Sequence, residues 1–209
     1  MKAKNIDNNM TNAKQTFITD RDVMVIKMLS VVCHASKAQL NNYIGNTRIY
    51  SLIASGILER SERAAYISDQ DRYEFAFRLT EKAKKLARSE FKIRAFYSSP
   101  SATHDVGMCN QYLSLSETEK GRIRNEGQTR NDFNAWCKAD PFERDEYKKA
   151  YKRKQISCTD FTYISDAGEL ICIETATDNY KDSDIAAKTK FAEAIGGKLK
   201  LIKIKSWRR

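Results

Sequence analysis

The last quarter of the chain constrains the fold most, because its pattern changes from strand to helix and back within fewer than fifty residues. In order, the composition and spacing predict a short strand, a polar turn, a second strand, a helix and a third strand, at residues 160–164, 165–168, 170–173, 182–195 and 199–204. Gly168 suits the turn because glycine tolerates positive φ. A hairpin followed by a helix and one further strand is the simplest interpretation.

Two acids lie at the ends of the predicted hairpin strands. Asp160 begins the first strand and Glu174 follows the second. Acids at the ends of adjacent strands can converge on one point, and carboxylate oxygens are the hard ligands that Mg²⁺ prefers. A metal held there would polarise a phosphate and activate a nucleophile. On the residues alone, the simpler interpretation is that both are ordinary solvated acids.

The charge of the chain narrows the class of partner. The net charge is +10 over 209 residues, and residues 1–95 hold 17 Lys and Arg against 10 Asp and Glu. A basic surface favours a polyanion, and DNA is the first candidate. Five scattered cysteines without a CxxC pair, with only two histidines, argue against a structural zinc site.

The cysteine usage fits reduced thiols in a cytosol. No apolar run approaches the length of a membrane span, and the N-terminus lacks the apolar core of a signal peptide. We therefore expect a cytoplasmic protein with no membrane partner. The polar, Asn-rich residues 1–15 are expected to form a disordered arm.

The N-terminal half predicts three helices in close succession. The first begins at Thr19 or Asp20, a second has capping-box spacing at Ser36–Gln39, and a third runs over about residues 47–54. A charged loop is expected from residue 59 to 72, followed by a strand at 73–79 and a helix capped by Thr80.

The stretch SGIL … YEFAFRLTEKAKKLA resembles a winged helix-turn-helix domain, here residues 16–95. The resemblance implies that the third helix enters the major groove of double-stranded DNA, with Arg48 as the best candidate for a base contact. The other implied DNA contacts are Asn46, Thr47, Tyr50 and Ser51 on that helix, with Lys37, Arg60, Arg63 and Arg72 near phosphate or the minor groove. Use of this domain for protein contacts or dimerisation is the alternative.

A turn-like segment at residues 97–101 marks the expected domain boundary. His104 and Asp105 open the next helix, where an acid suits the helix dipole, so a structural role is favoured over a catalytic one. A short strand is expected to end at Glu126, and residues 131–154 are helical with a break near Pro141. The basic residues at 148–154 either follow a DNA backbone or form a solvated helix face.

The element order of residues 101–209 resembles the restriction-endonuclease-like PD-(D/E)xK fold. Together with HD, NEGQTR, DFTY and IET, it is similar to the replication-relaxation family of plasmids and mobile elements, which includes mobilisation relaxases. The resemblance implies an α+β protein, a winged helix-turn-helix followed by an α/β domain with a central mixed sheet. It also implies catalytic roles for Glu126, Asp160 and Glu174, with Mg²⁺ or Mn²⁺ held by Asp160 and Glu174.

The chain departs from the family pattern at its lysine. That position is Ala176, and Thr159 replaces the proline before Asp160. A lysine on the following helix, Lys188 or Lys190, can fill the role, with Lys188 better placed. Without such a lysine the site would be inactive.

Three functions therefore remain open. The first is sequence-specific DNA binding at an origin of transfer or replication, as an accessory factor with a degenerate nuclease-like domain and a relaxase or replication protein as partner. The second is metal-dependent nicking of DNA as a relaxase. The third is a transcriptional repressor that forms a homodimer through its C-terminal half. Ala176 favours the first of these slightly.

Overall fold

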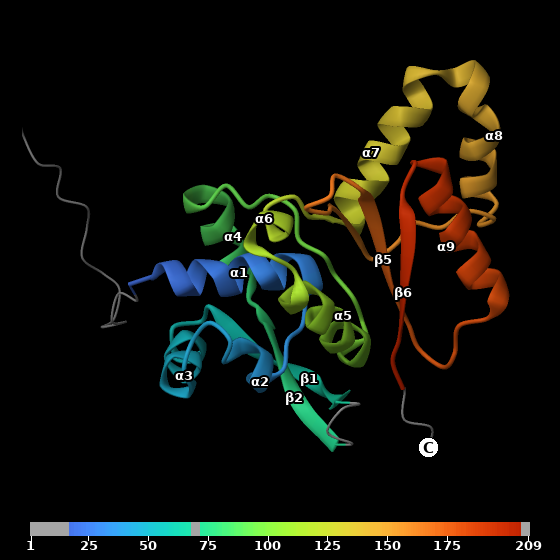
Figure 1. Cartoon of the computed structure of the whole chain (residues 1–209). Coiled ribbons are helices and arrows are strands. Elements are labelled where there is room, and N and C mark those ends of the chain that lie inside the picture. Colours follow the sequence, from blue (N-terminus) through green and yellow to red (C-terminus); the bar gives the residue numbers. More distant parts are fainter. Residues whose placement is uncertain (1–16, 68–71, 206–209) are drawn as a thin grey trace, which may run out of the picture.

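The described chain contains both helices and strands, and its first half carries a strand hairpin among helices (Figure 1). The computed structural model describes residues 17–67 and 72–205, so the predicted arm at 1–15 lies outside the described residues. The elements of this half are α1 (Asp20–Val32), α2 (Lys37–Leu40), α3 (Asn46–Ala54), β1 (Leu58–Ile67), β2 (Arg72–Leu79) and α4 (Glu81–Glu90).

Local side-chain caps explain where these helices begin. Thr19 caps α1 and Ser36 caps α2, each in a capping box, and Thr80 caps α4. These three starts were predicted from the sequence and are confirmed. The α3 helix begins after Gly45 and ends before Gly56, which has a φ of +69° that suits glycine.

The loop predicted over residues 59–72 is wrong, because residues 58–67 form strand β1. This strand pairs antiparallel with β2, and its register shifts between Arg60 and Ala64. The irregularity interrupts the alternation of apolar and polar residues, so the period-two signal of a strand is lost. Ala35 adds a single bridge to Phe77 of β2, which ties the α1–α2 connection to the hairpin.

The second half is built on a four-stranded mixed sheet. Its elements are α5 (Ala102–Ser114), α6 (Glu117–Lys120), β3 (Arg124–Asn125), α7 (Glu126–Ala139), α8 (Pro141–Lys152), β4 (Phe161–Ile164), β5 (Leu170–Ala176), α9 (Asp182–Ala194) and β6 (Lys198–Lys203). The strand order is β3-β4-β5-β6, in which β5 and β6 are parallel and the other pairs are antiparallel. The expected mixed sheet and the α+β class are confirmed at this level.

The strand expected to end at Glu126 is shorter than predicted. It holds only Arg124 and Asn125, and Glu126 is the first residue of α7, because the Asn125 side chain caps that helix. The break at Pro141 is confirmed, since α7 ends at Ala139 and Asp140 caps α8.

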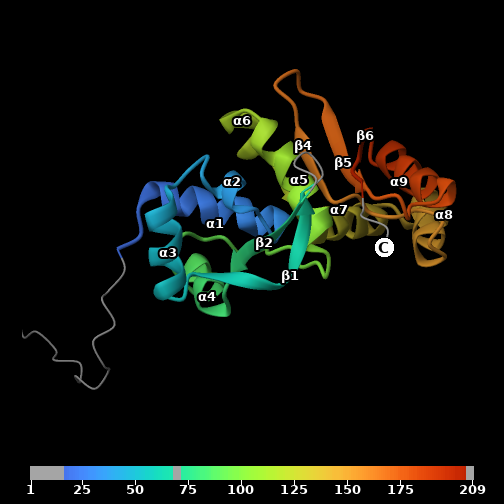
Figure 2. The same ribbon diagram turned by 90° about the horizontal axis from the view of Figure 1, so that it is seen from below.

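One hydrophobic core joins the two halves. Leu29 of α1, Met108 of α5 and Ile173 of β5 belong to the same buried cluster, and α1 lies beside α5 in both views (Figures 1 and 2). Helix α5 covers one side of the sheet and α9 the other. Gly107 allows the close approach of α5, because a Cβ there would lie 2.8 Å from Ile204 Cγ2. Within the described residues, no helix is both long and apolar enough to span a membrane.

Candidate active site and nucleic-acid interface

The two predicted acids lie on neighbouring strands and are both buried. Asp160 is 5% exposed and Glu174 is 0% exposed. The backbone N–H of Asp160 donates to Ile173 O at 3.0 Å, and Asp160 Oδ2 accepts from the N–H of Thr175 at 2.7 Å. Burial and the nearby charge of Asp160 raise the pKa of Glu174 to about 7. The interpretation of solvated strand-end acids is therefore wrong, since neither carboxyl lies in open solvent.

Lys188 of α9 reaches the same point. Its Nζ lies 3.0 Å from Glu174 Oε1 and donates to Cys158 O at 2.5 Å. The Tyr180 hydroxyl donates to the same Glu174 oxygen at 2.8 Å. The other oxygen, Glu174 Oε2, is buried and has no hydrogen-bond partner in the described structure. A lysine from the helix after the hairpin therefore lies beside Glu174.

Glu126 does not join the acid pair directly. It pairs with Arg130 one turn along α7, at 3.8 Å. Burial and the charges of Asp160, Asp105 and Glu126 together raise the pKa of Tyr97. The catalytic role of Glu126 stays a prediction.

Two histidines that the sequence left outside the site adjoin it. His104 Nε2 lies 3.2 Å from Asp160 Oδ2, and His104 Nδ1 lies 3.1 Å from Asp105 Oδ1. His34 Nδ1 lies 2.7 Å from the other oxygen of Asp105. Burial lowers the pKa of both imidazoles, but the hydrogen bonds to the carboxylates prevail and raise it to about 9 for His34 and about 10 for His104.

The sequence interpretation that gave His104 and Asp105 a helix-start role was incomplete. Asp105 does lie in the first turn of α5, but its carboxylate is fully buried between two imidazoles. The His-Asp pair was the available signal. The contact of this pair with Asp160 could not be recognised from the sequence, because Asp160 is more than fifty residues away.

Over residues 17–67 and 72–205, the only group of three or more His, Cys, Asp or Glu side chains within mutual reach is Cys33, His34 and Asp105. Within this group, His34 Nδ1 lies 2.7 Å from Asp105 Oδ2. Asp160 and Glu174 belong to no such group among these residues, and their role as metal ligands stays a prediction.

A hollow of about 660 Å³ opens next to Lys188. It lies between α8, the β5–α9 connection and α9. Tyr180 and Lys188 both line this hollow and contact Glu174, so the hollow adjoins the acid site. Its wall also carries Tyr151, Lys152 and Lys154, from the basic stretch noted in the sequence.

The α3 helix presents a polar face outward, as predicted. Ile49 and Leu52 are buried, whereas the predicted DNA contacts Asn46, Thr47, Tyr50 and Ser51 are exposed. A hollow of about 390 Å³ lies between α2, α3 and the β1–β2 hairpin. Five of the predicted DNA contacts line it, namely Lys37, Asn46, Tyr50, Arg60 and Arg72.

Aromatic rings lie among these cations. Lys37 Nζ is 5.4 Å from the centre of the Tyr50 ring, and the Arg60 guanidinium is 4.9 Å from that of Phe75. Tyr50 and Phe75 are 53% and 48% exposed. Arg72 forms an ion pair with Glu74. The side chain of Arg63 lies outside the described residues.

The role predicted for Arg48 is not supported by its geometry. Its guanidinium forms a fork on the buried Asp22, with Nε 3.0 Å from Oδ1 and Nη2 2.5 Å from Oδ2, and it also donates to Phe17 O. A guanidinium held in this way is not free to read a base edge. Arg48 instead anchors α3 to the start of α1.

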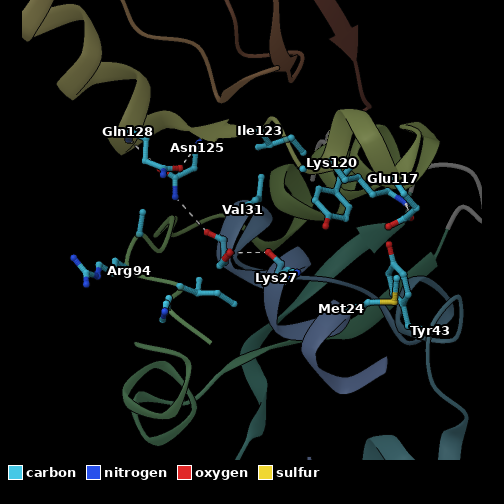
Figure 3. Close-up of a pocket in the computed structure, with 16 residues that line it drawn as sticks. Met24, Lys27, Val31, Tyr43, Arg94, Glu117, Lys120, Ile123, Asn125 and Gln128 are labelled. Carbon is cyan, nitrogen blue, oxygen red and sulfur yellow. Dashed lines mark hydrogen bonds and ion pairs between the residues drawn. The ribbon is translucent and has the colours of Figure 1, made fainter. Parts of the chain in front are cut away.

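A third hollow, of about 350 Å³, lies between α1, the segment at 92–95 and the α6–β3 region (Figure 3). Lys120 there is held by Glu117 at 2.8 Å, and Asn125 Nδ2 donates to Ser30 O at 3.5 Å. None of the predicted site residues lines this hollow. We assign it no ligand.

Comparison of the chain with protein-family models, curated proteins and solved structures finds no match. The function has to be argued from the two sites themselves.

Proposed function

We propose that this chain binds double-stranded DNA through its N-terminal half and cleaves one DNA strand at the Asp160–Glu174 site, as a mobile-element protein acting at an origin of transfer or replication. The observation that carries the proposal is Lys188 Nζ at 3.0 Å from Glu174 Oε1, beside Asp160. Two acids and a lysine at one point match what the resemblance to PD-(D/E)xK nucleases implies. The lysine favours an active site over the degenerate one expected from Ala176.

The chemistry of the acids fits Mg²⁺ or Mn²⁺. Glu174 Oε2 is buried without a hydrogen-bond partner among the described residues, and burial raises the pKa of Glu174 to about 7, so a cation at this oxygen would stabilise the ionised carboxylate. Asp160 and Glu174 would hold the cation, since hard divalent ions prefer carboxylate oxygens. Such a cation supplies charge neutralisation at a phosphate and lowers the pKa of bound water.

The protein groups would each have a separate task. Lys188 opposes the rise in the pKa of Glu174 and would offer a positive partner to the scissile phosphate. Tyr180 fixes the orientation of the Glu174 carboxylate through its hydroxyl. The cations of the adjoining hollow, Lys152 and Lys154, would follow the backbone of the strand being cut.

The N-terminal half would provide recognition in the manner of a winged helix-turn-helix. Helix α3 exposes Asn46, Thr47, Tyr50 and Ser51, and side chains of this type read base edges in the major groove. Lys37, Arg60, Arg63 and Arg72 are the proposed phosphate contacts. The cation-lined hollow between α3 and the hairpin supports this assignment.

The test is nicking of supercoiled plasmid that carries the element's own origin, with and without Mn²⁺. We expect metal-dependent nicking that is lost in Asp160→Ala and in Glu174→Ala. Glu169→Ala is the matched control, because Glu169 precedes β5 but is exposed and paired only with Lys198. Nicking that persists in both acid variants would refute the proposed site.

The two remaining candidates have distinct outcomes in the same experiment. A footprint at the origin without nicking would indicate the accessory role, in which a separate relaxase or replication protein makes the cut. Ala176, at the position where the family pattern has its lysine, favours that second candidate. Binding confined to the protein's own promoter would indicate a repressor, and a homodimer in solution would fit that role.

A further inference from the structure

We infer that His104 is a positioning residue for Asp160, held in place by Asp105 and by His34 of the N-terminal half. The inference rests on the proposed function, since it gives Asp160 a chemical task. It names the groups outside the hairpin that set the orientation of the Asp160 carboxylate. This orientation can be measured without DNA cleavage.

Two groups from other parts of the fold contact one oxygen of Asp160. Its Oδ2 accepts from the backbone N–H of Thr175 at 2.7 Å and lies 3.2 Å from His104 Nε2. Two donors on one oxygen oppose rotation of the carboxylate about its Cβ–Cγ bond. Among the described residues no hydrogen bond reaches Oδ1, so that oxygen is left for a cation. The two contacts therefore fix the orientation of the Asp160 carboxylate.

His104 is itself held in place by the carboxylate of Asp105. Asp105 is fully buried, and each of its oxygens contacts a different imidazole, Oδ1 at 3.1 Å from His104 and Oδ2 at 2.7 Å from His34. A buried carboxylate without partners is costly, whereas charge-assisted hydrogen bonds on both oxygens offset that cost. Carboxylate–histidine pairs of this kind orient groups around reactive centres.

The groups that support Asp160 come from both halves of the chain. His34 lies between α1 and α2, and the next residue, Ala35, exchanges two backbone hydrogen bonds with Phe77 of the hairpin, at 3.0 and 2.8 Å. His104 and Asp105 belong to α5, which Gly107 allows to pack against the strand ends near Thr175. The N-terminal half therefore contributes a side chain to the support of the acid site.

A purely structural role for the same groups is the competing explanation, because they also hold the two halves together. Two substitutions separate the roles. In His104→Asn the amide can replace Nδ1, so the contact with Asp105 is kept and the contact with Asp160 is lost. In His104→Gln the amide can replace Nε2, so the contact with Asp160 is kept.

The first measurement is the chemical shift of the Thr175 amide in the full-length, metal-free protein. This N–H reports on Asp160 directly, because it donates to Asp160 Oδ2. The second is the affinity for Mn²⁺ alone, from the free-ion signal in electron paramagnetic resonance. We expect His104→Asn to move the Thr175 resonance and weaken Mn²⁺ binding by roughly tenfold. We expect His104→Gln to stay closer to the wild type in both.

The results that would overturn the inference are distinct from those that would overturn the proposed function. An unmoved Thr175 resonance in a folded His104→Asn protein, or equal shifts in the Asn and Gln variants, would reduce His104 to a structural residue. If His104→Asn does not fold, His34→Gln replaces it, and an unmoved Thr175 resonance there would have the same meaning. Absence of nicking in the wild type would count against the cleavage function alone, since the Thr175 measurement needs neither DNA nor metal.

Discussion

The acid site and the proposed DNA-binding surface of α3 are built in opposite ways. Asp160 and Glu174 are buried, and donors from α5, β5 and α9 hold them in place. The exposed rings and cations around α3, such as Tyr50 and Arg60, have few fixed partners. A preorganised charged site lowers the cost of the chemical step, whereas an exposed basic surface adapts to its ligand. The contrast teaches that single substitutions should have large effects in the first region and small ones in the second.

The largest effect is expected from Lys188→Met. Loss of the cation beside Glu174 should reduce nicking by about 10²–10³-fold, the typical cost of one missing electrostatic group. The pKa of Glu174, already about 7, should rise further, because Lys188 is one of the groups that lower it. The acid limb of the rate–pH profile should therefore move to higher pH. Lys190→Met is the control, since Lys190 lies two residues away and is exposed. Equal loss in both variants would contradict the prediction.

The strand ends of the acid site could be predicted because they depend on local patterns. Asp160 and Glu174 follow from a turn flanked by two β-rich runs, and Lys188 from helical spacing after it. The contact of His104 with Asp160 could not be predicted, since it depends on how closely α5 packs against the sheet. Likewise, the β1 strand was missed because its register shift removed the alternation. Features that depend on local sequence patterns could be predicted, whereas contacts between distant elements could not.

The second prediction concerns the dependence of stability on pH in the buried region. The folded-state pKa of His34 is about 9, above the ordinary 6.5, so its pairing with Asp105 stabilises the fold fully below pH 6.5. This contribution is lost as the pH rises through about 9. We expect the free energy of unfolding in urea to fall by about 1–3 kcal/mol between pH 6 and pH 9.5. His34→Gln should remove part of that difference. An unchanged slope in this variant would exclude His34 as its source.

The third prediction tests whether Arg48 belongs to the buried region or to the proposed DNA-binding surface. Arg48→Ala leaves the fully buried Asp22 carboxylate without its forked partner. The expected loss of stability is about 1–3 kcal/mol, from a buried acceptor left unsatisfied. The preferred DNA sequence, measured by selection from a random pool, should stay the same. Thr47→Ala, on the exposed side of the same helix, should change stability by less than about 0.5 kcal/mol. A changed base preference in Arg48→Ala would restore the base contact expected from the sequence.

The smallest effect is expected on the proposed DNA-binding surface. Lys37 lies over the Tyr50 ring and lines the hollow between α2, α3 and the hairpin, and it is one of the proposed phosphate contacts. Lys37→Ala should weaken binding similarly for all DNA sequences and reduce the salt slope of log K by about 1, since one fewer counterion is released. Lys85→Ala on α4 is the matched control, because Lys85 is exposed and outside the hollow. The measurement is fluorescence anisotropy of labelled duplex over a series of salt concentrations. Equal slopes for both variants would mean that the charge of the whole protein, and not this surface, attracts DNA. A slope reduced only in Lys37→Ala would locate a phosphate contact beside α3, since both substitutions remove the same charge.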